Sequence, residues 1–175
     1  MKRSRRKSSK ARRIYAVCFL TAILAAYLFS RYAFQLLLIQ GKSMEPTYAS
    51  FSLTLIDKRG SVPERGDVIF FNAPGLKSKL VKRVVGIPGD TLVIKNGHLW
   101  VNGDIPKAYE DLLFDEAGLL QSEMTLKEKE YFVLGDNISE SKDSRSAEVG
   151  VILEKDIIGK LIPQRSIKEK MKDDR

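Results

Sequence analysis

The sequence predicts a mostly β fold, a coiled sheet or barrel of short strands, behind a single N-terminal transmembrane helix. A cluster of basic residues precedes seventeen residues without a charge, 14–30. Beyond residue 33, short apolar runs alternate with Gly, Pro and Asn turn signals, a pattern typical of an all-β barrel or coiled sheet. With 175 residues, the chain is long enough for one ordinary domain and a short appendage.

The N-terminal arm, residues 1–13, holds the excess positive charge of the chain. The chain has a net charge of +8, and the arm carries eight Lys or Arg residues and no acid. The other 162 residues carry 22 basic and 22 acidic side chains. Because the body of the protein is neutral, the charge does not indicate nucleic-acid binding. We expect no nucleic-acid partner and a solvated cytoplasmic arm.

Residues 14–33 are expected to form an uncleaved transmembrane signal anchor. At about 1.5 Å per residue, a helix over the uncharged run nearly spans a hydrocarbon core of about 30 Å. A cleaved signal peptide needs small residues at −1 and −3, but Ala22, Ala25 and Ala26 lack that spacing and bulky residues follow. A buried core helix would not follow eight positive charges. The positive-inside rule then puts the arm in the cytoplasm and the rest of the chain on the outer face of a cell membrane.

The outer domain is expected to cover residues 34–165, with a charged tail at 166–175. Its first strand is expected at 34–39, as part of the core, with contact between its apolar residues and lipid as the alternative. Asn96-Gly97 lies between two apolar runs and predicts a β-hairpin. Residues 107–129, rich in acids and leucine, are expected to hold a helical turn or an exposed loop. The later strands are predicted at 52–56, 67–71, 80–85, 91–95, 98–101, 130–134 and 157–162.

Ser43 is the candidate nucleophile, because it lies in a Gly41-Lys42-Ser43 turn directly after an apolar run. A serine hydroxyl needs a neighbouring base to take its proton. The only histidine, His98, follows the predicted hairpin turn, so a Ser-His-Asp triad is not favoured. One cysteine, Cys18, allows no disulfide within the chain, and a Cys/His metal cluster is not possible. We expect neither a metal nor another cofactor.

Lys82 is the candidate base, since lysine replaces histidine in known variants of the triad. Period-2 alternation puts Leu80, Lys82 and Val84 on one face of a predicted strand, so Lys82 lies between apolar neighbours. A general base must be the neutral amine, and burial lowers the pKa of a lysine from its usual value of about 10.4. The pattern leaves open that Lys82 is an exposed lysine on an edge strand.

A loop of hydrogen-bonding residues follows the strand at 130–134. It begins with Gly135-Asp136-Asn137 and ends with Asp143-Ser144-Arg145. Such loops are rigid because their side chains satisfy the backbone. An Asp-x-Arg pair in a loop is more often a structural ion pair than a catalytic one, so the residues alone leave its role open.

Four stretches together resemble type I signal peptidases, membrane-anchored serine peptidases that remove signal peptides from exported proteins. They occur in order behind the predicted anchor, and the match covers roughly residues 10–163. The stretches are Gly41 to Thr47, Arg65 to Phe70, Val81 to Asp90, and Gly135-Asp136-Asn137 through Ser141, Asp143, Ser144 and Arg145.

The resemblance implies a serine endopeptidase of the signal peptidase fold, whose groove takes an extended preprotein as an added strand. It implies that Ser43 attacks the scissile carbonyl, that Lys82 is the general base, and that Met44 lines the substrate pocket. Ser141 would orient Lys82, and Asp143 would pair with Arg145 to brace the site. The implied substrates are secretory preproteins with small residues at −1 and −3 of the signal peptide.

Gly41 departs from family members that use a hydroxyl at this position in the oxyanion hole. Backbone N–H groups, including that of Ser43, are expected to serve instead. This variant is similar to the short enzymes of Gram-positive bacteria. Two rival functions remain: another Ser-Lys peptidase of the same fold, such as a self-cleaving regulator, and a membrane-tethered β domain that binds surface proteins without cleavage.

Overall fold

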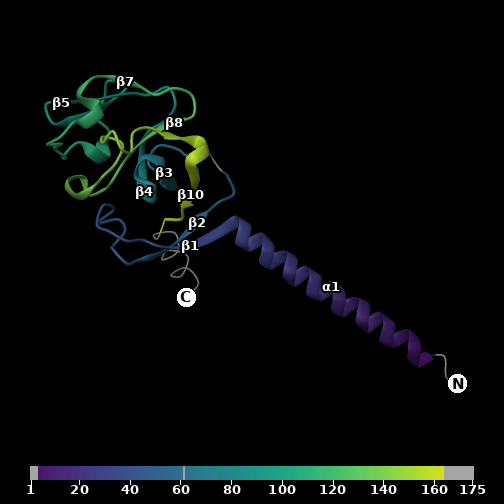
Figure 1. Ribbon diagram of the computed structural model, residues 1–175. Coiled ribbons are helices and arrows are strands. Elements are labelled where there is room, and N and C mark those ends of the chain that lie inside the picture. The colour runs from purple at the N-terminus through teal and green to yellow at the C-terminus, as the bar shows by residue number, and fades with distance from the viewer. Residues whose placement is uncertain (1–3, 61, 164–175) are drawn as a thin grey trace.

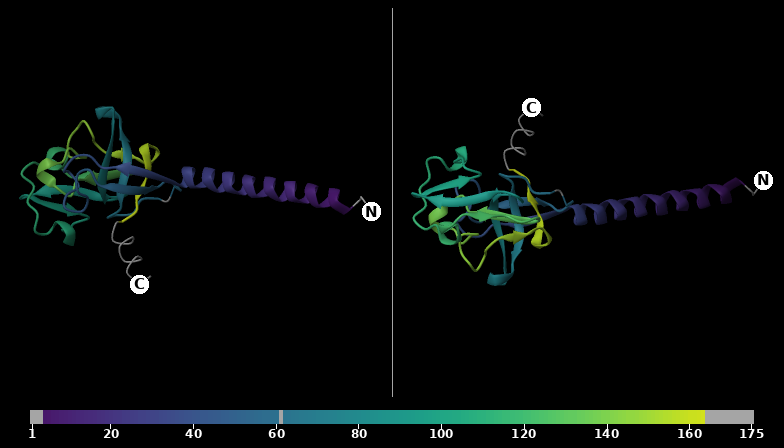
Figure 2. Two further views of the ribbon diagram at one scale, coloured as in Figure 1. Left: turned by 90° about the horizontal axis from the view of Figure 1, so that it is seen from below. Right: turned by 90° about the horizontal axis from the view of Figure 1, so that it is seen from above.

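A computed structural model describes residues 4–60 and 62–163, with the side chains of 4–9, 28, 30 and 31 left out. A long helix projects from one end of a β domain (Figures 1 and 2). The predicted charged tail, 166–175, lies outside the described residues, as does the end of the predicted outer domain, 164–165.

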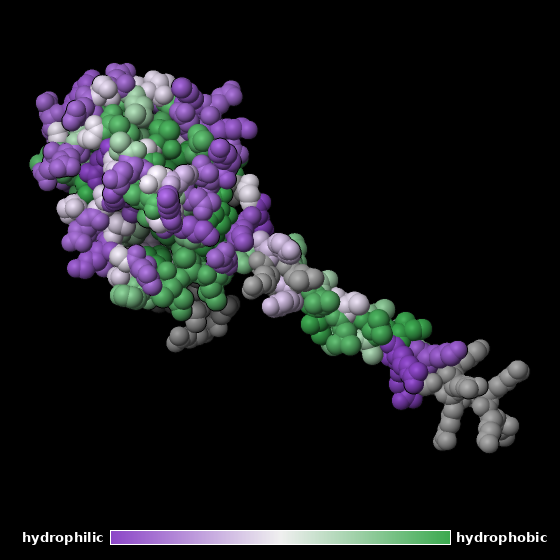
Figure 3. All heavy atoms as spheres, in the orientation of Figure 1, coloured by the Kyte–Doolittle hydropathy of each residue, from purple (hydrophilic) through white to green (hydrophobic). Residues whose placement is uncertain are grey.

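Helix α1, Ser4–Ala33, contains most of the basic arm and all of the uncharged run. No part of the domain covers its middle, and Figure 3 shows apolar surface there. Large apolar side chains along the helix are exposed, from Ile14 at 61% to Phe29 at 70%. Within the described part of the chain, no helix has the length and hydropathy needed to cross a membrane.

Seven strands form the main sheet, in the order β1-β2-β10-β3-β4-β8-β9. Neighbouring strands in it pair antiparallel, and β3 and β4 share the longest register, from Val68 opposite Arg83 to Ala73 opposite Ser78. The strands are β1 Phe34–Leu38, β2 Leu53–Asp57, β3 Val68–Ala73, β4 Ser78–Gly86, β8 Glu130–Leu134, β9 Ile152–Leu153 and β10 Ile157–Leu161.

A second sheet of three strands, in the order β6-β5-β7, forms the end of the domain far from α1 (Figures 1 and 2). Its strands are β5 Thr91–Lys95, β6 His98–Val101 and β7 Met124–Thr125. The predicted hairpin is confirmed: Lys95 pairs with His98 across Asn96-Gly97, whose φ angles are 53° and 77°. Two positive φ angles are what a tight hairpin turn requires, and Asn and Gly tolerate them best.

The mostly β prediction is confirmed, and each predicted strand has a counterpart in the structure. The two-residue strands β7 and β9 were not predicted, because two residues carry no alternation that could be recognised. The segment 107–129 holds 3₁₀ turns as well as β7. The expectation that residues 34–39 pack in the core is wrong for Leu36 and Leu38, which are 70% and 45% exposed at the sheet edge.

Candidate active site

Lys82 lies on β4, an internal strand with β3 on one side and β8 on the other. Its Cα pairs with that of Ile69, and only 3% of the residue is exposed. Leu80 and Val84, its neighbours on the same face, both pack in one apolar cluster. The alternation read from the sequence is therefore confirmed, and the alternative of an exposed edge strand is wrong.

Ser43 lies in the loop between β1 and β2. The loop is closed at its base by Ile39 and Phe51, since the Phe51 N–H donates to the Ile39 carbonyl at 2.7 Å. Two residues after Ile39, Gly41 has a φ of +98°, a conformation in which a side chain is strained. The N–H of Asn137 donates to the Ser43 carbonyl at 3.0 Å. The nucleophile candidate is thus held from both sides, by its own loop and by the polar loop after β8.

The amine of Lys82 and the hydroxyl of Ser43 meet at 2.5 Å, Nζ to Oγ. Burial lowers the pKa of Lys82 to about 8, against the opposing effect of the Asp143 and Asp136 carboxylates. Desolvation disfavours the charged amine, and with few polar partners the lysine does not recover that loss. At pH 7 about one tenth of the amine is therefore neutral and able to accept a proton.

Ser141 and Gly135 lie beside this pair. A Cβ on Gly135 would overlap the Ser141 side chain and the Ser43 carbonyl oxygen, so all three groups are in close contact. The Oγ of Ser141 is buried but has no hydrogen-bond partner among the described residues. The bond to Lys82 that the resemblance implied is not formed in this structure, although Ser141 lies next to the nucleophile.

Asp143 and Arg145 form a buried ion pair in the same loop. Arg145 donates from Nε to Asp143 Oδ1 at 2.9 Å and from Nη2 to Oδ2 at 3.0 Å. Arg145 Nη2 also donates to the Ile138 carbonyl at 2.8 Å, and the Gly135 N–H donates to Asp143 at 3.2 Å. The side chain of Arg145 is only 11% exposed, and that of Asp143 only 1%. The pair therefore ties both ends of the loop together beneath Ser141.

Arg83 and Asp136 form a second ion pair that the sequence analysis did not predict. Arg83 donates from Nη2 to Asp136 Oδ2 at 2.6 Å and from Nη1 to the Gly66 carbonyl at 2.8 Å. Its Nε donates to Asp136 Oδ1 at 2.7 Å, and Nη2 also makes a long contact with Thr47 Oγ1, at 3.4 Å. One signal was available: a charged residue next to Lys82 on an internal strand needs a partner. Which acid it would be could not be read from the sequence.

Met44 is 1% exposed and packs in an apolar cluster with Ile39, Tyr48 and Phe70. Its side chain therefore lies in the core, and a place in the substrate pocket stays a prediction. His98 begins β6 in the second sheet, whereas Ser43 lies next to the first. Within the described residues, no group of three or more His, Cys, Asp or Glu side chains could hold a metal ion.

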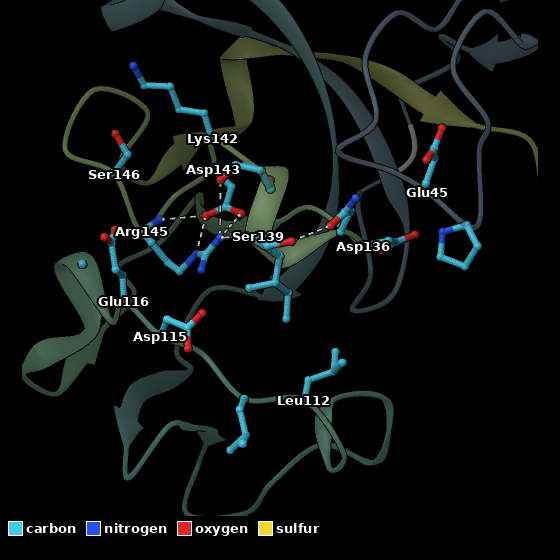
Figure 4. Close-up of a pocket in the computed structure, with 16 residues that line it drawn as sticks. Glu45, Leu112, Asp115, Glu116, Asp136, Ser139, Lys142, Asp143, Arg145 and Ser146 are labelled. Atoms are coloured by element: carbon cyan, nitrogen blue, oxygen red, sulfur yellow. Dashed lines mark hydrogen bonds and ion pairs between the residues drawn. The ribbon is translucent and has the colours of Figure 1, made fainter.

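A pocket of about 970 Å³ is lined by Ser141 and by Glu45 and Pro46, which follow Ser43 closely in the chain. Figure 4 shows the residues around it. One wall is the polar loop after β8, including Ser141, Asp143 and Arg145. The opposite wall is the segment from Leu112 to Gly118, and Glu45 and Pro46, just after Ser43, close one end. Neither Ser43 nor Lys82 itself lines the pocket, so it is an adjacent space and not the reaction centre.

The arrangement can activate a hydroxyl for attack on a carbonyl. A buried amine with a lowered pKa accepts the proton of the hydroxyl that it contacts. The backbone N–H of Ser43 takes part in none of the hydrogen bonds among the described residues, so it is available to a developing oxyanion. These are the elements of acyl transfer by a Ser-Lys pair.

Several known proteins are similar to this chain. A family model described as signal peptidase, peptidase S26, matches residues 12–163. The chain is 36% identical to signal peptidase I of Bacillus caldolyticus, over 90% of this chain and 92% of the relative. It is 33% identical to signal peptidase I P of Bacillus subtilis subsp. natto, over 90% of each. A solved signal peptidase I from Enterococcus faecalis V583 is 28% identical, with a TM-score of 0.48, over 58% of this chain and 98% of that one.

Proposed function

Since the chain belongs to the peptidase S26 family of signal peptidases and cleaves signal peptides from preproteins, we propose that Ser43 is its nucleophile and Lys82 its general base. One observation carries the proposal: the 2.5 Å contact between Ser43 Oγ and the Nζ of a buried lysine. The depressed pKa of Lys82, at about 8, supports the role of base.

The reaction then proceeds in two halves. Neutral Lys82 takes the proton of the Ser43 hydroxyl as its oxygen attacks the scissile carbonyl. The resulting ammonium gives that proton to the leaving amine, which departs as the N-terminus of the mature protein and leaves an ester on Ser43. Lys82, neutral again, takes a proton from water, and the hydroxide attacks the ester. Protonation of the Ser43 oxygen by Lys82 releases the signal peptide.

The oxyanion of each half is stabilised by the Ser43 N–H in this proposal, because Gly41 offers no hydroxyl. Asp143 and Arg145 act as positioning residues, since their ion pair holds the loop that carries Ser141. Ser141 orients Lys82 once its side chain turns toward the amine. Preferred substrates carry small residues at −1 and −3, as the resemblance implies.

We further propose that residues 14–33 anchor the enzyme in a bacterial cell membrane, with the N-terminus in the cytoplasm. The uncharged run 14–30 and the eight basic residues before it support this topology. So does the exposure of large apolar side chains along α1, from Ile14 to Tyr32, which no part of the domain covers. Protease added outside intact cells should digest the chain beyond residue 40 and spare the first thirteen residues.

A preprotein cleavage assay with the full-length enzyme in detergent tests the catalytic pair. Ser43→Ala and Lys82→Arg should each lower kcat/KM by at least about a thousandfold, as loss of a nucleophile or base does in other serine peptidases. Arginine keeps the charge but does not give up its proton in proteins.

Ser122→Ala and Lys79→Arg are matched controls, because both residues are exposed and Lys79 lies on the same strand as Lys82. Both controls should cleave at the rate of the unaltered enzyme. Cleavage by Ser43→Ala would overturn the proposed nucleophile, and full activity of Lys82→Arg would overturn the neutral-lysine mechanism.

A further inference from the structure

The pocket next to Ser43 is large enough to hold part of a polypeptide. Its volume of about 970 Å³ is at the upper end of the range for ligand pockets, about 300–1,000 Å³. It begins at Glu45 and Pro46, two and three residues beyond Ser43. An extended chain that passes the nucleophile at about 3.3 Å per residue reaches this space within a few residues.

The electrostatic character of the pocket is acidic. Among its charged residues, Asp143 is neutralised by Arg145, Asp136 by Arg83, and Lys142 is paired with Glu148. Three further carboxylates line it, and none has a cationic partner among the described residues. They are Glu45 at one end, and Asp115 and Glu116 on the far wall, as Figure 4 shows.

The apolar surface between these carboxylates suits the stem of a long basic side chain. Leu112, Leu113 and Ile138 line the same pocket as these carboxylates. Lysine and arginine lay their methylene groups on apolar surface while the charged head remains solvated or paired. A neutral or acidic side chain gains less there, and an acidic one is repelled by the three carboxylates.

The position of the pocket decides which part of a preprotein enters it. The wall from Leu112 to Gly118 belongs to the end of the domain opposite α1, and the Phe114 N–H donates to the Gly97 carbonyl of the β5–β6 turn at 2.8 Å. Figures 1 and 2 show that end far from the helix. A signal peptide held in the same bilayer as α1 approaches Ser43 from the helix side, so the segment beyond the scissile bond continues away from it.

We propose that this pocket is a specificity site for the first residues of the mature protein, and that it favours a basic side chain there. The inference rests on the proposed function, because it takes Ser43 as the point of cleavage. Asp115 and Glu116 are its specificity-determining residues, since they are exposed, lie outside the catalytic pair and face the space from the far wall.

The test uses preproteins that differ only in one residue, Lys, Gln or Glu, at each of the first five positions after the scissile bond. The full-length enzyme should cleave the Lys form about threefold to fivefold faster in kcat/KM than the Glu form at one or two of these positions, the upper part of the range for exposed ion pairs. In the D115N/E116Q variant the Lys-to-Glu ratio should fall toward one. Added salt should also reduce it in the unaltered enzyme.

The E123Q/E128Q variant is the matched control, because it removes the same charge from exposed residues outside the pocket. Its Lys-to-Glu ratio should equal that of the unaltered enzyme. An equal fall in both variants would show a bulk charge effect and overturn the site, as would equal cleavage of the Lys and Glu forms. The same Lys and Glu substitutions made two residues before the scissile bond give a further test. A preference for Lys that appears only there would overturn the assignment of the pocket to the first residues of the mature protein.

Failure of this inference is distinguishable from failure of the proposed function. If all forms are cleaved at one rate, Ser43 and Lys82 keep their roles and only the pocket assignment is lost. If no form is cleaved, or if Ser43→Ala cleaves them, the catalytic assignment itself is wrong.

Discussion

Lys82 Nζ lies 2.5 Å from Ser43 Oγ, although 39 residues separate the two in the chain. The contact joins the internal strand β4 to the loop that follows β1, the edge strand of the same sheet. Three strands separate β1 and β4 in the order of the sheet. The polar loop after β8 helps to hold the nucleophile loop in place, since the Asn137 N–H donates to the Ser43 carbonyl at 3.0 Å. The consequences of this contact and its supports can be measured.

The pH dependence of cleavage should report the neutral form of Lys82. Burial lowers the pKa of this lysine to about 8, so kcat/KM should rise about tenfold per pH unit below 8 and level off above it. At pH 7 about one tenth of the amine is then neutral, against about one part in 2,500 for an ordinary lysine. A profile that continues to climb through pH 10 would contradict the base assignment, provided that the enzyme remains folded.

Lys82→Met should abolish cleavage and yet stabilise the folded protein at neutral pH. The folded pKa of about 8 is lower than that of an unfolded lysine, so below pH 8 the folded state bears the full cost of burying a charged amine. Methionine removes that cost, and the free energy of unfolding at pH 7 should rise by about 1–3 kcal/mol.

The stability gain from Lys82→Met should shrink between about pH 8 and 10.4. In this window the unfolded state binds more protons than the folded one, so the unaltered enzyme gains stability as the pH rises. Denaturant unfolding of both forms at pH 7 and pH 9.5 measures the difference. A gain that is the same at both pH values would mean that the folded lysine titrates as in the unfolded chain.

Asp143→Asn should destabilise the protein strongly. It leaves the guanidinium of Arg145, whose side chain is 11% exposed, without its carboxylate partner, and the loss of one partner of a buried pair costs about 3–5 kcal/mol. The neighbouring pair of Lys142 and Glu148 provides the control, because both side chains are more than half exposed. Lys142→Gln should cost less than about 1 kcal/mol. Equal costs in thermal unfolding would contradict the bracing role of Asp143.

Gly135→Ala should lower kcat/KM at least about tenfold through displacement of the nucleophile, since misplacement by about 1 Å can cost a hundredfold. Its Cβ would overlap the Ser141 side chain and the Ser43 carbonyl oxygen, so one of them must move. Gly103→Ala is the comparison: Gly103 has a φ of +88° but open space around it, and it lies in the turn after β6. That variant should lose some stability but retain activity. Unchanged cleavage by Gly135→Ala would show that the loop accommodates the methyl group elsewhere.

Local patterns in the sequence were sufficient for the strands and for the environment of Lys82. Alternation at residues 80–84 placed the lysine between two apolar side chains, and Asn96-Gly97 marked the hairpin, because both signals act between neighbours in the chain. The ion pair of Arg83 with Asp136 joins residues 53 positions apart, and no local pattern specifies such a partner.

The pocket could not be predicted for a similar reason. Its walls, Leu112 to Gly118 and the loop after β8, are irregular segments whose positions depend on the packing of both sheets. Met44 illustrates the same limit at a single residue: its place in the core cluster depends on Tyr48 and Phe70. A turn next to a nucleophile is equally compatible with an exposed or a buried side chain.

Helix α1 ends at Ala33 and strand β1 begins at Phe34, with no linker between them. The Lys58 N–H also donates to the Ala33 carbonyl at 2.8 Å, which fixes the junction to the strand after the loop of Ser43. With the proposed anchor in a bilayer, this direct junction keeps the catalytic pair at a short, fixed distance from the end of the helix. The enzyme then selects a preprotein by the elevation at which its scissile bond leaves the membrane, as well as by the residues around that bond.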